Sequence, residues 1–332
     1  MDVRPSPEQE ALRDSVKQVV GRLGPKAVAD LDDGERRAEI DAAVEASGWR
    51  ELRSAAGGRG TWGSGVEAAI VAEELGRGLA DTPFIGPTLA TELRRLTDGS
   101  AAGRETVALR VDLSELGDSV AVDATGASLA LGLREGQVLE LPVGAAAAAA
   151  DLTRHLARAG QRGTPIGTLL SDDLGRWTAL GLALTCADLV GVMRGAVGLA
   201  CEYARERRQF GVAIGSFQAV QHLLADAQVA AEGSRSIMLH AAWAVDALAP
   251  TEALAAAASA KAYCARAGRE VCEAAIQVHG GIGNTWECMA HVFLRRALVS
   301  AELLGGVGPS LERVLCHHGL SQEGVGGRDG LR

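Results

Sequence analysis

Residues 203–222 combine arginine and glutamine in a pattern that suits an anionic ligand. Arg207, Gln209 and Gln218 gather around Gly211, where the spacing predicts the end of a helix followed by a tight turn. An arginine can bind a diphosphate through two parallel hydrogen bonds, and glutamine offers both a donor and an acceptor. A basic residue at a helix end can equally serve only to stabilise the helix dipole, so this segment alone leaves both interpretations open.

Two later segments also carry polar residues that a helix core does not require. Residues 276–283 read Ile-Gln-Val-His-Gly-Gly-Ile-Gly, so a predicted helix runs into Gly280 and Gly281. Backbone N–H groups without a neighbouring Cβ suit close approach to a phosphate or sugar, although paired glycines also form ordinary C-terminal caps. Residues 285–296 contain Trp286, His291 and Arg296, and they also fit an amphipathic helix with a solvated basic edge.

The N-terminal third predicts the first of the elements that must position these residues. Ser6, Pro7 and Gln9 have the spacing of a capping box with proline at the first helical position. Apolar residues then recur at helical spacing, and further helices are expected over 39–48, 65–77 and 88–96, separated by glycine-rich turns such as 56–60. Residues 1–104 are therefore predicted to form an all-helical domain.

The pattern changes after residue 104. Residues 105–112, 119–123 and 137–143 alternate apolar and polar side chains, which predicts strands in a short β domain over 105–170. Within it, 145–150 is a run of alanine that could start a helix or form a loop. Helical spacing returns over 171–320, with Pro250 expected in a loop, and 321–332 is expected to be a flexible tail. The predicted fold class is α+β, mainly α, with separate helical and β layers.

Composition excludes several classes of protein. The 332 residues carry a formal net charge of −9, which argues against a nucleic-acid partner. Six cysteines form no C-x-x-C pair, so neither a metal site nor a disulfide framework is expected. No export signal or membrane span is apparent, and the expected location is the cytoplasm. No nucleotide-binding G-x-G-x-x-G follows a predicted strand.

Taken together, the motifs resemble the acyl-CoA dehydrogenase family from Pro5 to about Arg313. The resemblance is carried by Glu73-Glu-Leu-Gly-Arg with Pro83, by residues 207–211 with 217–218, and by residues 277–287. It implies an N-terminal helical domain, a β domain and a C-terminal four-helix bundle. It also implies tetramers built as pairs of dimers, with FAD lying across the dimer interface.

The same resemblance implies a set of cofactor contacts made to the neighbouring subunit. In the family, most of the matching residues reach the diphosphate and adenosine of the neighbour's FAD, and two lie beside the same cofactor. The residues of this chain that match are Arg207, Gln209, Phe210, Gln218, Gln277, Val278, His279, Gly280 and Gly281.

The catalytic base of the family has no counterpart at the matching positions. Removing the α-proton of a thioester requires a carboxylate, and most members place it where this chain has Leu304. A second group of members carries it at the position of Gly181, and the neighbouring positions that hold an acid and an arginine for CoA are Ala179 and Leu182. Glu302 is the remaining candidate, two residues from the first position, whereas Asp188 is seven residues from the second.

The β segment also lacks the Thr-Glu-Pro-like loop and the Trp-x-x-x-Asn strand that hold the flavin ring in typical members. The chain therefore resembles the shortened, base-less subunits of actinobacterial heteromeric acyl-CoA dehydrogenases, which act on steroid side-chain CoA thioesters. This predicts a subunit that contributes FAD contacts to a full-length dehydrogenase chain in an α2β2 heterotetramer, with the acyl-CoA in the partner's pocket. Two alternatives remain open: a self-sufficient dehydrogenase that uses Glu302, and a flavin-free structural subunit.

Overall fold

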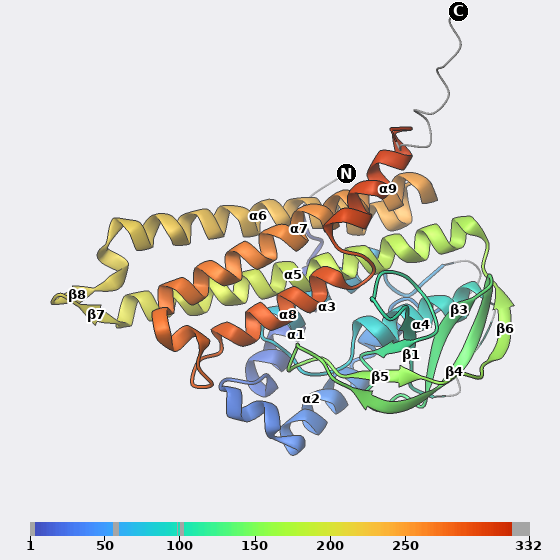
Figure 1. Cartoon of the computed structure of the whole chain (residues 1–332), viewed down its shortest axis with the longest axis horizontal. Coiled ribbons are helices and arrows are strands. Elements are labelled where there is room, and N and C mark those ends of the chain that lie inside the picture. The colour runs from blue at the N-terminus through green and yellow to red at the C-terminus, as the bar shows by residue number, and fades with distance from the viewer. Residues whose placement is uncertain (1–3, 56–59, 98, 100–102, 321–332) are drawn as a thin grey trace, which may run out of the picture.

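The computed structural model describes residues 4–55, 60–97, 99 and 103–320 (Figure 1). The predicted tail at 321–332 and most of the glycine-rich turn at 56–60 lie outside these ranges. Helices come first, a sheet follows, and long helices complete the chain, so the predicted α+β fold class with a predominance of helix is confirmed. The helices of the first part are α1 (Pro7–Leu23), η1 (Val28–Asp32), α2 (Gly34–Ala46), η2 (Trp49–Glu51), α3 (Gly65–Arg77) and α4 (Ile85–Leu96).

The start of α1 follows the sequence prediction. The Ser6 hydroxyl accepts from the backbone N–H of Gln9 at 3.3 Å, and the Gln9 side chain accepts from the backbone N–H of Ser6 at 3.0 Å. Both bonds satisfy N–H groups that a helix start otherwise leaves unpaired. The helix expected over 65–77 is α3, and those expected over 39–48 and 88–96 overlap α2 and α4.

Two fully buried glutamates on α3 tie the first helices to the long ones. Glu73 accepts from Arg13 of α1 at 3.0 Å and also pairs with Arg194 and Arg235 of the later helices. Helix α3 packs closely on the first long helix, because a Cβ at Gly191 would collide with the backbone carbonyl oxygen of Glu73. A buried carboxylate left without such partners would be strongly destabilising, so these ion pairs fix how the helices meet.

The middle of the chain forms a six-stranded sheet in the order β3-β1-β2-β5-β4-β6. Strand β3 also pairs with β4, so the pairings return to the strand where they began. Strand β1 is parallel to β3, whereas the other pairs are antiparallel. The strands are β1 (Glu105–Leu109), β2 (Val120–Val122), β3 (Leu129–Arg134), β4 (Gln137–Ala147), β5 (Leu156–Ala159) and β6 (Thr164–Thr168).

The alanine run at 145–150 differs from both structures that the sequence allowed for it, a helix start and a loop. It is neither the start of a helix nor wholly a loop, because β4 continues to Ala147 and pairs with β5 there. Ala146 lies opposite Ala157, and Ala147 lies opposite Leu156. Alanine has little preference for strands, so the cross-strand partners supply the conformation at this place.

Long helices make up the remainder, and they are α5 (Ser171–Glu206), α6 (Gln218–Ala247), α7 (Pro250–His279), α8 (Ala290–Glu302) and α9 (Val307–His317). Pro250 does not lie in the loop expected from the sequence. It is the first residue of α7, where proline sacrifices no hydrogen bond. By length and composition α5 could cross a membrane, but 89% of its most apolar window is buried inside the protein. It is the central helix of the bundle, in contact with α3, α6, α7 and α8.

Candidate functional site

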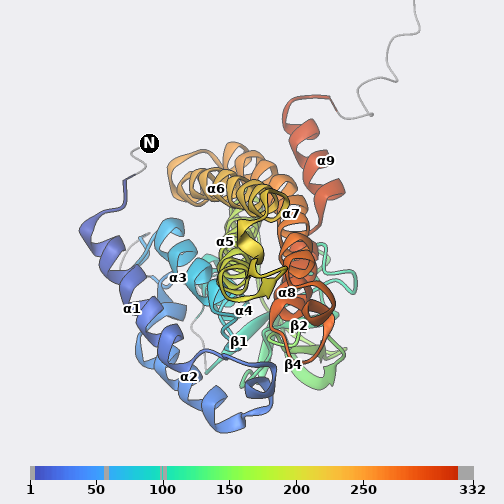
Figure 2. The ribbon, with the colours of Figure 1, turned by 90° about the vertical axis from the view of Figure 1, so that its left-hand side faces the viewer.

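A short hairpin projects from the end of the bundle between α5 and α6 (Figures 1 and 2). Helix α5 ends at Glu206, five residues earlier than the sequence predicts, and the chain continues as β7 (Arg208–Gln209) and β8 (Val212–Ala213). Phe210 and Gly211 form the turn with φ of 54° and 83°. Two consecutive left-handed residues make the type of turn whose twist matches a two-stranded hairpin, so Gly211 ends the turn and not the helix.

The hairpin presents its predicted ligands to solvent. Arg207, Gln209 and Gln218 are all exposed, and Gln218 is the first residue of α6. The backbone of Arg207 is fixed, because its N–H donates to Tyr203 O at 2.9 Å and its carbonyl accepts from Ile214 N–H at 2.8 Å. The guanidinium and both amides are therefore held on a rigid backbone while their side chains remain accessible.

The ring of Phe210 is 93% exposed, at the tip of the hairpin. It meets the edge of Phe217 with 6.2 Å between ring centroids. The two rings place apolar surface at the tip of the hairpin, next to the exposed Gln209 and Gln218.

A second loop lies at the same end of the bundle, where α7 ends at His279 and η4 (Gly280–Asn284) follows. Gly280 has a φ of 65°, and no atom would lie within 4 Å of a Cβ at Gly280 or Gly281. Gln277 is exposed beside them. The backbone is therefore open to close approach, which is what a phosphate or sugar would require.

The remaining two predicted residues face inward. Val278 and His279 are buried, with 7% of each exposed. The His279 ring stacks on Tyr203 of α5 at 4.5 Å between centroids, and its Nδ1 lies 2.8 Å from Ala275 O. Tyr203 is not among the predicted site residues, yet its stacking holds the ends of α5 and α7 together and so brings the hairpin and the glycine loop to one end.

Leu304 and Gly181, the two positions at which the family resemblance implies a base, meet each other in the protein interior. Leu304 is 2% exposed, and a Cβ at Gly181 would collide with its Cδ1 and lie 3.4 Å from Leu89 Cδ1. The neighbouring Ala179 and Leu182 are fully buried. An aliphatic side chain thus fills the space where a carboxylate would have to work.

The two carboxylates near these positions, Glu302 and Asp188, do not have the surroundings that a catalytic base requires. Glu302 is exposed at the last residue of α8, with an oxygen 2.8 Å from where a Cβ of Gly306 would be. Asp188 is fully enclosed and accepts from Arg296 at 2.7 Å and Ser300 at 2.6 Å. Burial would raise the pKa of Asp188, but Arg296 and Arg154 outweigh it and hold that pKa below its usual range.

A buried lysine fixes the loop that carries Leu304, and sequence reasoning missed it. Lys261 of α7 donates to Ser300 O at 2.5 Å, Leu303 O at 2.9 Å and Thr185 Oγ1 at 3.1 Å. Burial lowers the pKa of this lysine to about 8. Only the position of one lysine among apolar residues of a predicted helix could have signalled this role.

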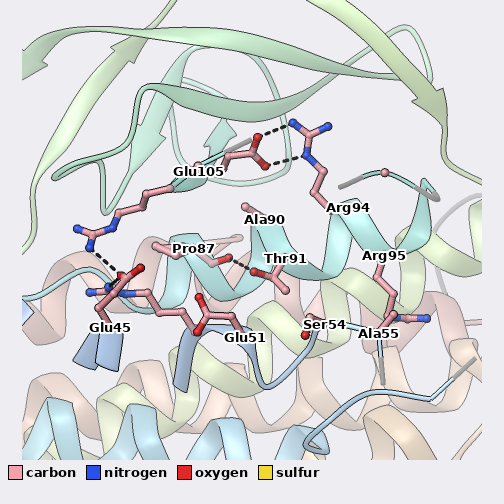
Figure 3. A pocket seen from close by; sticks show the side chains of 14 residues that line it. Glu45, Glu51, Ser54, Ala55, Pro87, Ala90, Thr91, Arg94, Arg95 and Glu105 are labelled. Carbon is pink, nitrogen blue, oxygen red and sulfur yellow. Dashed lines mark hydrogen bonds and ion pairs between the residues drawn. The ribbon is translucent and has the colours of Figure 1, made fainter. Parts of the chain in front are cut away.

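A cavity of about 370 Å³ lies beside α4 (Figure 3). Four arginines line its wall, and each has a carboxylate partner in the described structure. The pairs are Arg50 with Glu45 and Asp41, Arg94 with Glu105, Arg95 with Glu92, and Arg104 with Asp41 and Glu45. These ion pairs hold α2, α4 and β1 together, so the arginines at this wall serve the fold.

Comparisons with known proteins agree with this geometry. A family model described as the acyl-CoA dehydrogenase C-terminal domain matches residues 177–307. The chain is 33% identical over 334 residues to acyl-CoA dehydrogenase IpdE2 of Mycobacterium tuberculosis, covering 93% of this chain and 97% of that protein. IpdE2 of Mycolicibacterium smegmatis is 31% identical over 331 residues, covering 93% and 98%.

Solved structures share the fold. The Tcur3481-Tcur3483 steroid ACAD variant superposes with a TM-score of 0.79 at 22% identity, covering 96% of this chain and 99% of that one. The ChsE4-ChsE5 complex from Mycobacterium tuberculosis gives 0.77 at 23% identity, covering 97% and 100%. With relatives that match over nearly their whole length, the chain belongs to the acyl-CoA dehydrogenase family of FAD-dependent oxidoreductases, which act on the CH–CH bond of CoA thioesters.

Proposed function

We propose that this chain is a non-catalytic subunit of a heteromeric acyl-CoA dehydrogenase that lends FAD contacts to its partner. The partner is a full-length dehydrogenase chain that supplies the base and the acyl-CoA pocket in a cytoplasmic heterotetramer. Within this proposal, residues 1–104, 105–170 and 171–320 are the helical, shortened β and bundle domains.

The observation that carries the proposal is an asymmetry between two parts of the chain. The end of the bundle presents Arg207, Gln209 and Gln218 to solvent beside the open backbone of Gly280 and Gly281. At the interior position of the base stands Leu304, an aliphatic side chain that cannot accept a proton. A subunit with its own active site would need a carboxylate in this second region, whereas a subunit that completes a neighbour's site needs only the first.

The exposed residues fit the diphosphate and adenosine end of FAD. The Arg207 guanidinium can donate two parallel hydrogen bonds to phosphate oxygens, and the amides of Gln209, Gln218 and Gln277 can donate or accept at ribose and adenine. Backbone N–H groups at Gly280 and Gly281 can approach the same group without steric hindrance. When bound in the partner's site, the flavin supplies the hydride acceptor. The residues of this chain orient and neutralise its anionic end.

The structural neighbours support a partner and a substrate class. The ChsE4-ChsE5 neighbour is a complex of two chains, and the Tcur3481-Tcur3483 neighbour is a steroid ACAD. By analogy we propose a steroid-derived CoA thioester as the substrate of the assembled enzyme. The exposed position of Glu302 argues against the self-sufficient alternative, and the open cluster at Arg207 argues against a flavin-free structural subunit.

The decisive experiment replaces Arg207 with alanine in the complex co-expressed with the full-length chain. A charge-assisted contact to diphosphate is worth about 1.5–3 kcal/mol, so the substitution should lower the affinity of the complex for FAD roughly 10- to 150-fold. Fluorescence of released flavin on dilution measures this, and gel filtration confirms that the complex remains assembled. Arg269→Ala is the matched control, because Arg269 is an exposed α7 arginine paired with Glu273.

If FAD affinity is unchanged in an intact Arg207→Ala complex, Arg207 is not a cofactor ligand. A flavin-free structural role would then be favoured. Flavin bound by this chain purified alone would instead favour the self-sufficient dehydrogenase.

A further inference from the structure

A cavity of about 550 Å³ lies between the N-terminal end of α1, α3 and α6. Figure 2 shows α3 between α1 and α6, and α3 is in contact with both. None of the lining residues belongs to the site described above. The cavity is lined by Arg4, Pro5, Ser6, Gln9, Arg13, Val66, Ile70, Arg235, Leu239 and Trp243.

The charge at this cavity differs from that at two other large cavities. Three arginines line it, and among the described residues no aspartate or glutamate does. The cavity beside α4 has three glutamates on its wall, and the one near Leu304 has two glutamates and an aspartate. A cavity wall with cations alone is unexpected in a chain whose net charge is −9, and it favours an anionic ligand.

Buried carboxylates beneath the cavity hold its arginines in place. Glu73 has no exposed surface, and its two oxygens accept from Arg13 Nη1 at 3.0 Å and Arg235 Nε at 3.3 Å. Arg194 pairs with the same glutamate, and Glu74 accepts from Arg13 at 2.9 Å. With Arg77 on Glu74, four arginines share two glutamates, which leaves a surplus of positive charge.

Arg235 keeps donors for a ligand. In the described part of the chain its side chain donates to Glu73 through Nε, so both terminal nitrogens are available, and 32% of the side chain is exposed. The apolar part of the lining is formed by Ile70 of α3 and by Leu239 and Trp243, which follow Arg235 along the same face of α6. A guanidinium fork beside an aromatic and aliphatic surface matches a carboxylate attached to an apolar body.

We propose that this cavity is a binding site for a small amphipathic carboxylate. The carboxylate lies on Arg235 and Arg13, and the apolar part packs on Trp243, Leu239 and Ile70. Its volume is within the range of ordinary ligand sites. The cavity is built from residues that play no part in the proposed FAD contacts, so the two proposals stand or fall separately.

The test is isothermal titration of the full chain with octanoate as the probe. Octanol has the same apolar body without the charge, and inorganic phosphate has charge without the apolar body. We expect saturable binding of octanoate and at least about 10-fold weaker binding of the other two. Arg235→Gln should weaken octanoate binding at least about 10-fold, whereas Arg269→Gln should leave it unchanged.

A second variant covers the case in which Arg235→Gln fails to fold because it disturbs Glu73. Leu239→Glu leaves both partners of that ion pair in the chain and adds a carboxylate one helical turn from Arg235, where it would compete for the guanidinium, so it should abolish octanoate binding. Three outcomes would overturn the proposal. The first is that octanol binds as tightly as octanoate, and the second is that a folded Arg235→Gln or Leu239→Glu variant keeps the octanoate affinity of the unsubstituted protein. The third is that the unsubstituted protein shows no saturable binding of octanoate.

Discussion

Leu304 and Gly181 occupy one space, so that neither position could accept a larger side chain unless the other changed. The δ-methyl of Leu304 takes the volume that a Cβ at Gly181 would need, and Leu89 closes the same space from α4. Leu304 has a φ of 62°, and its N–H donates to Leu113 O at 2.7 Å. The loop therefore docks against the β1–β2 connection in a fixed conformation, with an apolar side chain turned into the core.

This fit predicts unequal costs for two glycine substitutions in α5. Gly181→Ala should destabilise the protein by about 1–3 kcal/mol through overpacking. Gly198→Ala is the matched control, because no atom would lie within 4 Å of its Cβ, and it should stabilise the helix by about 0.5–1 kcal/mol. Urea unfolding followed by circular dichroism measures both. Equal effects would show that the contact with Leu304 is relaxed in solution.

Glu302 should be dispensable for turnover. If the base belongs to the partner, Glu302→Gln in the complex should change kcat by less than about threefold, whereas loss of a general base costs at least roughly 10²-fold. Steady-state assays with acyl-CoA and an artificial electron acceptor measure kcat, with FAD content checked in each sample. A loss of two orders of magnitude at unchanged FAD content would make this chain catalytic.

The flavin content of the complex should be one FAD per heterodimer. Under the proposed function only the partner chain seats the isoalloxazine ring, because this chain has Leu304 at the position expected for the base. Flavin absorbance against protein concentration, with the chain ratio measured by quantitative gel staining, gives the number. One FAD per polypeptide would contradict the proposal.

Lys261 should impose a pH dependence on stability. Its pKa lies at about 8 in the folded protein, below its usual 10.5, so between these values the unfolded chain binds more protons than the folded chain. Stability contributed through this group therefore rises as pH increases from about 8 to about 10.5, and it is lowest below pH 8. Each unit of pKa difference between the folded and the unfolded chain changes the free energy of unfolding by about 1.4 kcal/mol.

Lys261→Met removes this titration while keeping an unbranched side chain. As the pH rises across that window, the unfolding free energy of the natural chain should increase relative to that of Lys261→Met. Urea titrations at several pH values from neutral to the upper end of the window provide the measurement. Lys17→Met is the control, because Lys17 is a surface residue paired with Asp14. A difference that stays constant with pH would show that the pKa of Lys261 is the same in the folded and the unfolded chain.

Helix starts and ends that depend only on neighbouring residues can be predicted from the sequence. The capping box at Ser6 is formed within a single helical turn, and the helix end before Gly280 depends on a local glycine. The sequence alone places the end of α5 five residues late, because the turn at Phe210 and Gly211 and a helix cap share the same glycine signal.

Long-range partners are not predictable from the same signals. Arg296 is compatible in sequence with a solvated helix edge, but it is 5% exposed and bonded to Asp188, 108 positions earlier in the chain. Arg235 belongs to a cavity only because Glu73 on another helix holds it. Single-sequence patterns report which face of a helix is apolar, and they do not report which charged residue on another helix meets it.

The pairing scheme of the β segment bears on how the chain avoids association through that segment. Because the strand neighbours return from β4 to β3, each of β1 to β5 has a hydrogen-bonded neighbour on both sides. An open sheet of short strands would offer unpaired edges on which other chains could add. Among the described strands of this sheet, β6 is bonded on one side, and it is five residues long with a proline at its second position. The β3–β4 pairing closes this ring, so its disruption is expected to expose strand edges on which other chains could add.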